Sequence, residues 1–145
     1  MFSQDFKEFV ELLIKNNAEY LIVGGFAVAI HGHPRYTGDL DIWINPTQQN
    51  AENIVKVVNA FGFASFQLTP EDFIKPGNVI QLGYPPFRID ILTEVDGVEF
   101  DDCFENRKQV TIGEMKVNFI SYNDLMKNKK ASGLPIDLDD IDNLK

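Results

Sequence analysis

The sequence predicts an α/β (α+β) fold, in which a mixed, curved β-sheet carries helices packed on its outer face. Three observations support this fold class. Residues 20–44 read as a branched apolar strand, a glycine pair, a short helix and a second strand. Residues 2–17 carry apolar side chains at helical spacing. Alternating segments on either side of Gly113-Glu114 predict a β-hairpin.

Length and composition predict one domain that spans residues 1–145. With 145 residues, 44% of them hydrophobic, the chain can enclose a core and is too apolar to be disordered. No apolar run approaches the roughly 20 residues that cross a bilayer. The first residues lack the basic segment of a signal peptide. The single cysteine, Cys103, excludes an internal disulfide and fits a reducing compartment. We therefore expect a cytoplasmic protein with no membrane contact.

The charge balance limits the partners that the chain can bind. Thirteen Lys and Arg residues face 22 Asp and Glu residues, which gives a formal net charge of −9. Broad, sequence-independent DNA binding needs a basic surface, so we do not expect it. A single nucleotide, or an RNA end held through metal ions, remains compatible with this charge.

Apolar periodicity and capping residues predict the other elements. Ser3 is expected to cap the first helix, Thr47 the second and Asp137 the last, and Gly62 is expected to end the second. In chain order we expect a helix at 48–61, a strand at 63–68, a helix from Thr69, a turn at 76–77, strands at 79–82 and 87–92 around a loop at 83–86, a helical turn at 100–106, the hairpin strands 109–112 and 115–120, and helices at 122–131 and 138–144.

The glycine pair that follows the first strand is a candidate phosphate site. Gly24 and Gly25 stop the apolar run 20–23, and residues 26–30 favour a helix directly afterwards. A helix N-terminus offers unpaired N–H groups and the positive end of the helix dipole, and glycine lets an anion approach the backbone. Taken alone, such a pair is more often an ordinary turn. The sequence around it has neither the P-loop pattern nor G-x-G-x-x-G.

Three aspartates in apolar strands form a candidate metal site. Asp39 and Asp41 alternate with apolar residues in the strand 39–44, so both face one side of the sheet, which we expect to be the exposed concave side. Asp90 lies between two isoleucines of a later strand. Adjacent carboxylates on a half-buried strand repel each other, and a divalent cation would offset that repulsion. Oxygen ligands suit Mg²⁺ or Mn²⁺ better than zinc. If the two strands are neighbours, the three carboxylates converge; the alternative is a solvated strand edge.

Other chemically versatile residues have structural interpretations. His31 and His33 stand beside a Gly-Pro loop and are expected to pack there rather than bind a metal. Trp43 shares the face of Asp41, so it either borders the site or fills the end of the sheet. Four phenylalanines are expected in the core rather than as a base-stacking platform: Phe61, Phe63, Phe66 and Phe73.

The order of these motifs resembles the nucleotidyltransferase superfamily with the DNA polymerase β fold. That family has a glycine pair, an Asp-x-Asp strand and a third Asp on a later strand, as at 24–25, 39–41 and 90. Residues 35–42, RYTGDLDI, look like the Arg-x-Thr-x-Asp-hydrophobic-Asp block of small bacterial and archaeal members. The tail 130–141, KASGLPIDLDDI, is similar to their C-terminal motif. Such members include the AbiEii-type toxins of toxin–antitoxin and phage-abortive systems; aminoglycoside nucleotidyltransferases are more distant relatives.

The resemblance implies roles for individual residues. Asp39 and Asp41 would bind two Mg²⁺ ions, and Asp90 would complete one metal site and accept the proton of the acceptor hydroxyl. From the residue pattern rather than the resemblance, we expect Asp140 to lie on a solvated helix face with Asp137, Asp139 and Asp142, or else to orient Lys130. The tail departs from the family motif where basic residues are replaced by Leu134 and Ile136. Nucleotide contacts are implied for Gly24, Gly25, Arg35, Thr37 and Lys130.

We therefore expect a Mg²⁺-dependent nucleotidyltransferase, with Mn²⁺ as a substitute ion. It would move NMP from an NTP such as ATP to an acceptor hydroxyl and release pyrophosphate. The acceptor is a small molecule, a protein or an RNA end, and a partner protein, as in a toxin–antitoxin system, could supply further surface. Two alternatives stay open: a non-catalytic member that binds or regulates a partner, and a metal-dependent phosphatase or nuclease.

Overall fold

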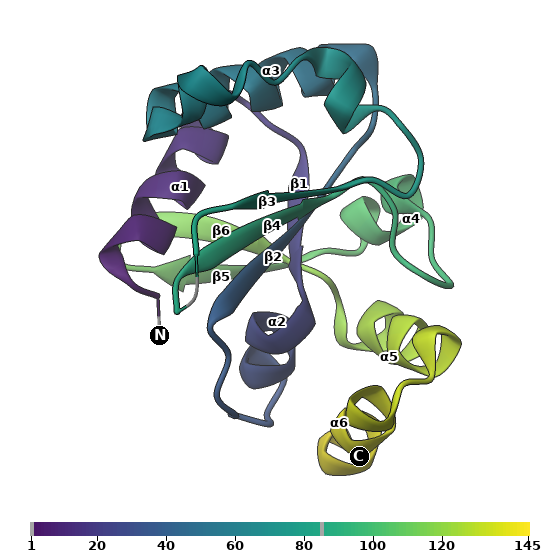
Figure 1. The fold of residues 1–145 in the computed structure, drawn as a ribbon. Coiled ribbons are helices and arrows are strands. Elements are labelled where there is room, and N and C mark those ends of the chain that lie inside the picture. The colour runs from purple at the N-terminus through teal and green to yellow at the C-terminus, as the bar shows by residue number, and fades with distance from the viewer. Residues whose placement is uncertain (1, 85) are drawn as a thin grey trace.

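A six-stranded mixed β-sheet forms the centre of the protein. We describe residues 2–84 and 86–145 in a computed structural model (Figure 1). The strand order is β3-β4-β2-β1-β6-β5, which confirms the predicted fold class. The strands are β1 (Tyr20–Val23), β2 (Asp39–Ile44), β3 (Val79–Leu82), β4 (Arg88–Leu92), β5 (Lys108–Ile112) and β6 (Met115–Phe119).

The helices lie on both sides of this sheet, so the prediction that they pack on one outer face is wrong. In Figure 1, α3 lies above the strands and α1 at their left end, and α2, α5 and α6 lie below them. The predicted caps at Ser3 and Thr47 are present, since each hydroxyl accepts a hydrogen bond from the backbone N–H three residues later. The helices are α1 (Gln4–Lys15), α2 (Gly24–Ile30), α3 (Gln48–Val58), α4 (Phe100–Glu105), α5 (Tyr122–Ser132) and α6 (Pro135–Leu144).

The pairing of the central strands fixes where the polar residues of the sheet lie. Strand β2 runs antiparallel to β1 and parallel to β4. In that register Asp41 stands opposite Val23 on one side and Asp90 on the other. Because side chains alternate along a strand, Asp39 and Asp41 share one face of the sheet with Asp90.

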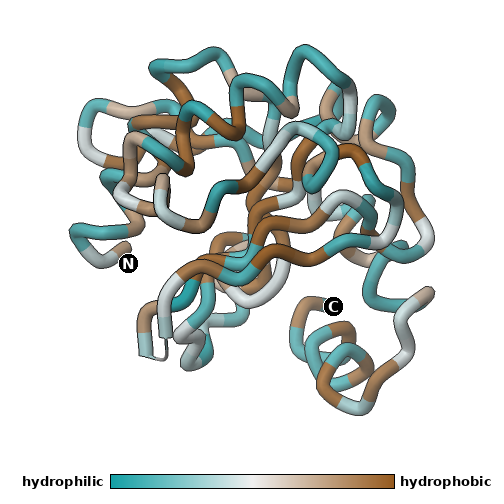
Figure 2. Tube along the Cα trace, turned by 45° about the horizontal axis from the view of Figure 1, so that its top comes forward, coloured by the Kyte–Doolittle hydropathy of each residue, from teal (hydrophilic) through white to brown (hydrophobic). Residues whose placement is uncertain are grey.

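The opposite face of the same strands builds the hydrophobic core. Leu40, Ile42 and Ile44 are fully buried, together with Phe9 of α1 and Ile54 of α3. Figure 2 shows the hydrophobic residues concentrated along the central strands. Among the described residues, no helix has the length and apolar character needed to cross a membrane.

The strand predicted at 63–68 is wrong. The chain continues from α3 through a π-helical turn (Asn59–Phe63) into a 3-10 turn (Ala64–Phe66). Helix α3 ends at Val58, and Gly62, which was expected to end it, lies inside the π-helical turn, where its φ of +116° breaks the helical geometry. The aromatic rings of this segment contact one another instead of pairing with a strand: Phe61 stacks on Phe63 at 5.9 Å. Of the four phenylalanines expected in the core, Phe73 is fully buried, two pack against the core and Phe66 is exposed.

The start of the last helix also differs from the prediction. Helix α6 begins at Pro135 rather than at residue 138, because proline has the backbone angle of a first helical residue and needs no N–H partner there. Asp137 therefore lies inside the first turn, where it accepts a hydrogen bond from the backbone N–H of Leu134 at 3.3 Å. The short helix expected from Thr69 is a 3-10 turn, Pro70–Phe73. In the predicted loop at 83–86, residue 85 lies outside the described residues.

A buried ion network ties α5 and α6 to the loop that leads into β2. Asp140 on α6 is fully buried and accepts two hydrogen bonds from Arg35, at 2.9 and 3.0 Å. Lys129 on α5, also buried, lies 3.0 Å from Asp137 and 3.2 Å from Asp140. Burial acts to raise the pKa of Asp140, but hydrogen bonds from Arg35 and Lys129 outweigh it and lower that pKa. The prediction of a solvated face therefore fails at Asp140.

We predict that Asp140→Ala destabilises the protein by about 3 kcal/mol, because it leaves two cations in a partly desolvated place without their carboxylate. The neighbouring Asp139 is exposed, so Asp139→Ala should stay within about 0.5 kcal/mol of the wild type. Urea unfolding of both variants measures the difference. Equal effects would show that the network does not hold the C-terminal helices.

Candidate active site

The glycine pair shapes the junction between β1 and α2. Gly24 has a φ of +67°, and a Cβ atom at this position would overlap the carboxylate of Asp41. A Cβ atom at Gly25 would meet the hydroxyl of Thr37. Glycine is needed here because the Asp41 and Thr37 side chains press against the backbone. The predicted residues Gly24, Gly25, Thr37 and Asp41 therefore lie together.

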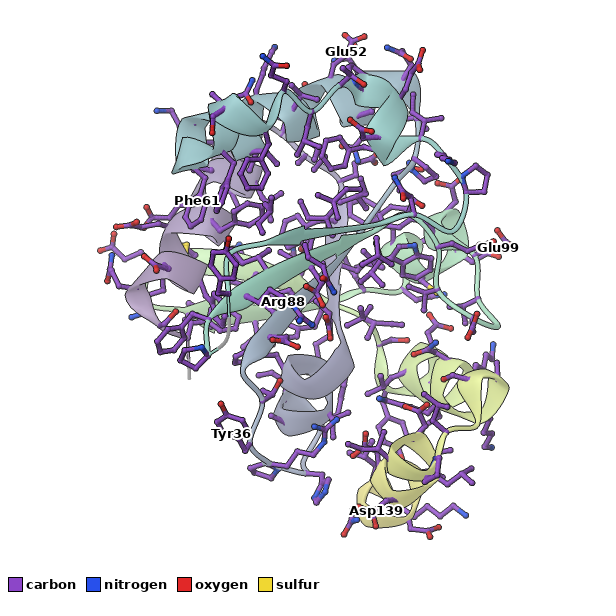
Figure 3. All side chains as sticks on the ribbon, in the orientation of Figure 1. Tyr36, Glu52, Phe61, Arg88, Glu99 and Asp139 are labelled. Carbon is purple, nitrogen blue, oxygen red and sulfur yellow. The ribbon has the colours of Figure 1, made fainter. Side chains whose placement is uncertain are left out.

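The three predicted aspartates share one face of the sheet, around an arginine that sequence reasoning missed, but their oxygen atoms do not all lie within 4.8 Å of one another. Arg88 donates two hydrogen bonds to Asp90, at 2.8 and 3.0 Å, and one to Asp39 at 2.9 Å. Figure 3 shows Arg88 over the strands on the side of α2. The signal was present in the sequence, since Arg88 is two residues before Asp90 and must share its face.

The surroundings of Asp41 disfavour its ionised form. Burial, followed by the charges of Asp90 and Asp39, raises the pKa of Asp41 from its ordinary value of 3.8 to about 7. Lys129 and Arg88 act in the opposite direction but do not cancel this effect. Three carboxylates with one bound guanidinium leave a surplus of negative charge at this face. Such a donor set fits a divalent cation with oxygen ligands.

The two basic residues predicted to contact phosphate, Arg35 and Lys130, lie in different surroundings. Arg35 lies in the Asp140 network, and Lys130 is exposed. The lysine that turns inward is Lys129, one residue earlier, so Asp140 orients Lys129 rather than Lys130. Thr37 donates a hydrogen bond to the backbone carbonyl of Asp39 at 3.3 Å and so holds the start of β2.

A second group of ligand-type side chains is already neutralised. Within the described residues, His33, Asp139 and Asp140 form the only cluster of three or more His, Cys, Asp or Glu residues whose ligand atoms lie within 4.8 Å of one another. Both carboxylate oxygens of Asp140 are paired with Arg35, and one of them also with Lys129. Little negative charge is therefore left for a metal ion. His31 contacts the carbonyl of Ile120 at 2.8 Å, in agreement with a packing role.

Comparisons with known proteins identify the family. The chain matches, over residues 4–145, a family model described as a nucleotidyltransferase of unknown function (DUF6036). The chain belongs to this nucleotidyltransferase family. The match covers the strands, the glycine pair and the C-terminal helices, so it includes every part of the site described above. A search of curated protein sequences finds no match.

Solved structures share the fold of this DUF6036 nucleotidyltransferase at low sequence identity. A candidate nucleotidyltransferase of Thermotoga maritima (TM1012) has a TM-score of 0.64 and 13% identity, covering 88% of this chain and 82% of its own. The lincosamide antibiotic adenylyltransferase LnuA, bound to lincomycin, has a TM-score of 0.59 and 13% identity, covering 99% and 96%. The antibiotic-resistance factor ANT(2'')-Ia has a TM-score of 0.60 and 12% identity, covering 97% and 80%.

We predict that Gly24→Ala destabilises the protein more than Gly113→Ala. Both glycines have a positive φ, +67° and +63°, but only Gly24 faces a side chain, since nothing lies within 4 Å of a Cβ at Gly113. The backbone conformation alone should cost about 1 kcal/mol in each variant. The excess for Gly24→Ala, measured by urea unfolding, reports the contact with Asp41. Equal costs would contradict this close packing.

The raised pKa of Asp41 predicts a pH dependence of stability. Because the folded-state pKa of about 7 lies above the unfolded value, the folded protein binds an additional proton between these two values. The contribution of Asp41 is therefore fully present below pH 4 and is lost as the pH rises to about 7. Melting temperatures in EDTA between pH 4 and 8 should show this loss in the wild type relative to Asp41→Asn, which cannot ionise. Parallel curves would show that Asp41 titrates normally.

Proposed function

We propose that this protein is a Mg²⁺-dependent nucleotidyltransferase that moves NMP from an NTP to an acceptor hydroxyl. The observation that carries the proposal is the meeting of Asp39, Asp41 and Asp90 on one sheet face, next to Gly24. Members of the same family are described as nucleotidyltransferases. The whole described chain would act as one domain in this reaction.

In the proposed reaction the acceptor oxygen attacks the α-phosphorus of the nucleotide. A new P–O bond forms, the bond between the α-phosphorus and the bridging oxygen breaks, and pyrophosphate leaves. The proton of the hydroxyl passes to a carboxylate oxygen of Asp90. Asp39, Asp41 and Asp90 would hold two Mg²⁺ ions, which supply positive charge to the attacking and leaving oxygens. Transfer of this kind needs positioning and charge neutralisation rather than a protein nucleophile.

Arg88 compensates part of the negative charge of the site in the absence of substrate. Its guanidinium spans Asp39 and Asp90, the same carboxylates that would bind Mg²⁺. Binding of Mg²⁺ by Asp39 and Asp90 would leave the guanidinium free to bind the triphosphate, whose oxygens match its planar fork. Gly24 is half-buried beside Asp41 and Gly25 is buried beside Thr37, so a phosphate at this predicted contact would require those two side chains to turn away. Two further predicted phosphate contacts are Arg35, which is paired with Asp140, and Lys130, which is exposed.

The structural neighbours support ATP as donor and a small molecule as acceptor. LnuA is an adenylyltransferase bound to lincomycin, and ANT(2'')-Ia is seen with adenylyl-2''-tobramycin. The toxin–antitoxin setting and a partner protein rest on the sequence resemblance alone. For that reason the decisive experiment offers the enzyme a complete lysate of its host rather than one chosen acceptor.

The test is label transfer from α-labelled ATP, GTP, CTP and UTP in the presence of Mg²⁺ and host lysate. We expect a labelled product with the wild type and a loss of at least about a thousandfold, or about 4 kcal/mol, with Asp41→Asn. Asp139→Asn, an exposed aspartate outside the site, is the matched control and should retain activity.

Three results would decide against the proposal. Label transfer that survives in Asp41→Asn would place the chemistry elsewhere. Free nucleotide without transfer would favour the phosphatase or nuclease alternative. If no NTP gives label and Mg²⁺ with NTP causes no thermal shift, the non-catalytic binding partner is favoured instead.

A further inference from the structure

A cavity of about 880 Å³ lies beyond the candidate active site, at the end of the same two strands. Trp43 of β2 and Thr93, directly after β4, form part of its wall. Trp43 is two residues after Asp41 and on the same face, which corresponds to about 7 Å along the strand. The rest of the wall comes from the segment 93–103, the loop after β2, Ile74 and Pro76 before β3, and the first half of α5. None of the three site aspartates lines it.

The wall of this cavity is strongly acidic and hardly compensated. One lysine, Lys127, lines it, and within the described residues its 3.9 Å contact with Asp124 is the only ion pair of these carboxylates. The Lys127 side chain is 68% exposed, so solvent screens the pair. A concave surface concentrates the field of such charges. The carboxylates are Glu94, Asp96, Glu99, Asp101, Asp102 and Asp124.

Two buried polar atoms of the wall have no partner within the described chain. Asp124 lies in the first turn of α5 with its side chain only 10% exposed, and its Oδ2 atom has no hydrogen-bond partner within the described residues. The thiol of Cys103 lies beside this carboxylate, and burial together with the charge of Asp124 raises the pKa of that thiol, but a thiol is only a weak donor. The indole N–H of Trp43, in a residue that is 2% exposed, donates none. Buried polar groups in folded proteins are almost always paired, so both atoms indicate a missing partner. Asp124 needs a donor and Trp43 an acceptor.

Two aromatic residues form part of the same wall with only a small part of each exposed, 2% of Trp43 and 6% of Phe100. The rings of Trp43 and Phe100 pack edge to face, with centroids 5.2 Å apart, and both residues line the cavity. Carboxylates together with aromatic rings are the combination that recognises alkylammonium groups. The volume is within the range of small-molecule sites and far exceeds that of one metal ion. The surplus of negative charge disfavours a nucleotide.

We propose that this cavity binds a small organic cation with two or more ammonium groups. One ammonium group donates to Asp124 on the floor, and the others lie among the carboxylates at the rim. The aliphatic part of the ligand packs against Trp43 and Phe100. A hydroxyl group of the ligand can accept a hydrogen bond from the indole N–H of Trp43. This binding is independent of nucleotide transfer, so it can fail or succeed separately from the proposed function.

The test is isothermal titration calorimetry of the whole chain with spermidine and with tobramycin, without nucleotide and at physiological salt. We expect one saturable site in the wild type. Asp124→Asn and the double variant Glu94→Gln/Asp96→Asn should each weaken binding at least tenfold. The second variant changes only exposed side chains, so it keeps the test valid if Asp124→Asn unfolds. Tighter binding of tobramycin indicates an aminated sugar; tighter binding of spermidine indicates a linear polyamine.

Glu114→Gln is the matched control, because it removes an exposed charge at the β5–β6 turn, outside the cavity. Binding that falls equally in this variant, or that never saturates, would show general attraction to a chain of charge −9 and overturn the proposal. Full displacement of spermidine by an equal concentration of Mg²⁺ would also overturn it, because it would identify a metal site.

Discussion

The repulsion among Asp39, Asp41 and Asp90 is the constraint on which the site depends. The parallel pairing of β2 and β4 places Asp41 opposite Asp90, and the core on the other face of the sheet prevents the strands from separating. One guanidinium, that of Arg88, compensates two of the three carboxylates. Asp41 lies against Gly24 without such a partner, and its pKa is accordingly raised. The fold therefore maintains a negative centre that favours cations.

Ion pairs connect the C-terminal helices to the loop that precedes Asp39 and Asp41. Lys129 and Arg35 meet at the buried Asp140, so α5 and α6 are joined to the loop that delivers Asp39 and Asp41. The positive charge of Lys129 opposes the rise in the pKa of Asp41, so the network is close enough to influence the site electrostatically. The tail that resembles other small nucleotidyltransferases in sequence thus has a structural role here, although Leu134 and Ile136 are exposed and apolar.

Local patterns predicted most of the elements and the three aspartates, because alternation within a strand decides which side chains share a face. The convergence of Asp90 with Asp41 needed the assumption that β2 and β4 are neighbours, which the register confirms. The lysine that turns inward could not be chosen from sequence, since the rotation of α5 is set by its packing on α6. The strand predicted at 63–68 failed because nothing local shows that the sheet edge lies elsewhere.

The most direct test of this account is the position of Mn²⁺ in crystals grown with a non-hydrolysable NTP analogue. Anomalous scattering locates the ion without reference to activity. We expect Mn²⁺ among the carboxylate oxygens of Asp39, Asp41 and Asp90, with Arg88 moved away from them. Mn²⁺ at His33 and Asp139 instead, with Arg88 still paired to Asp39 and Asp90, would contradict the assignment of the active site.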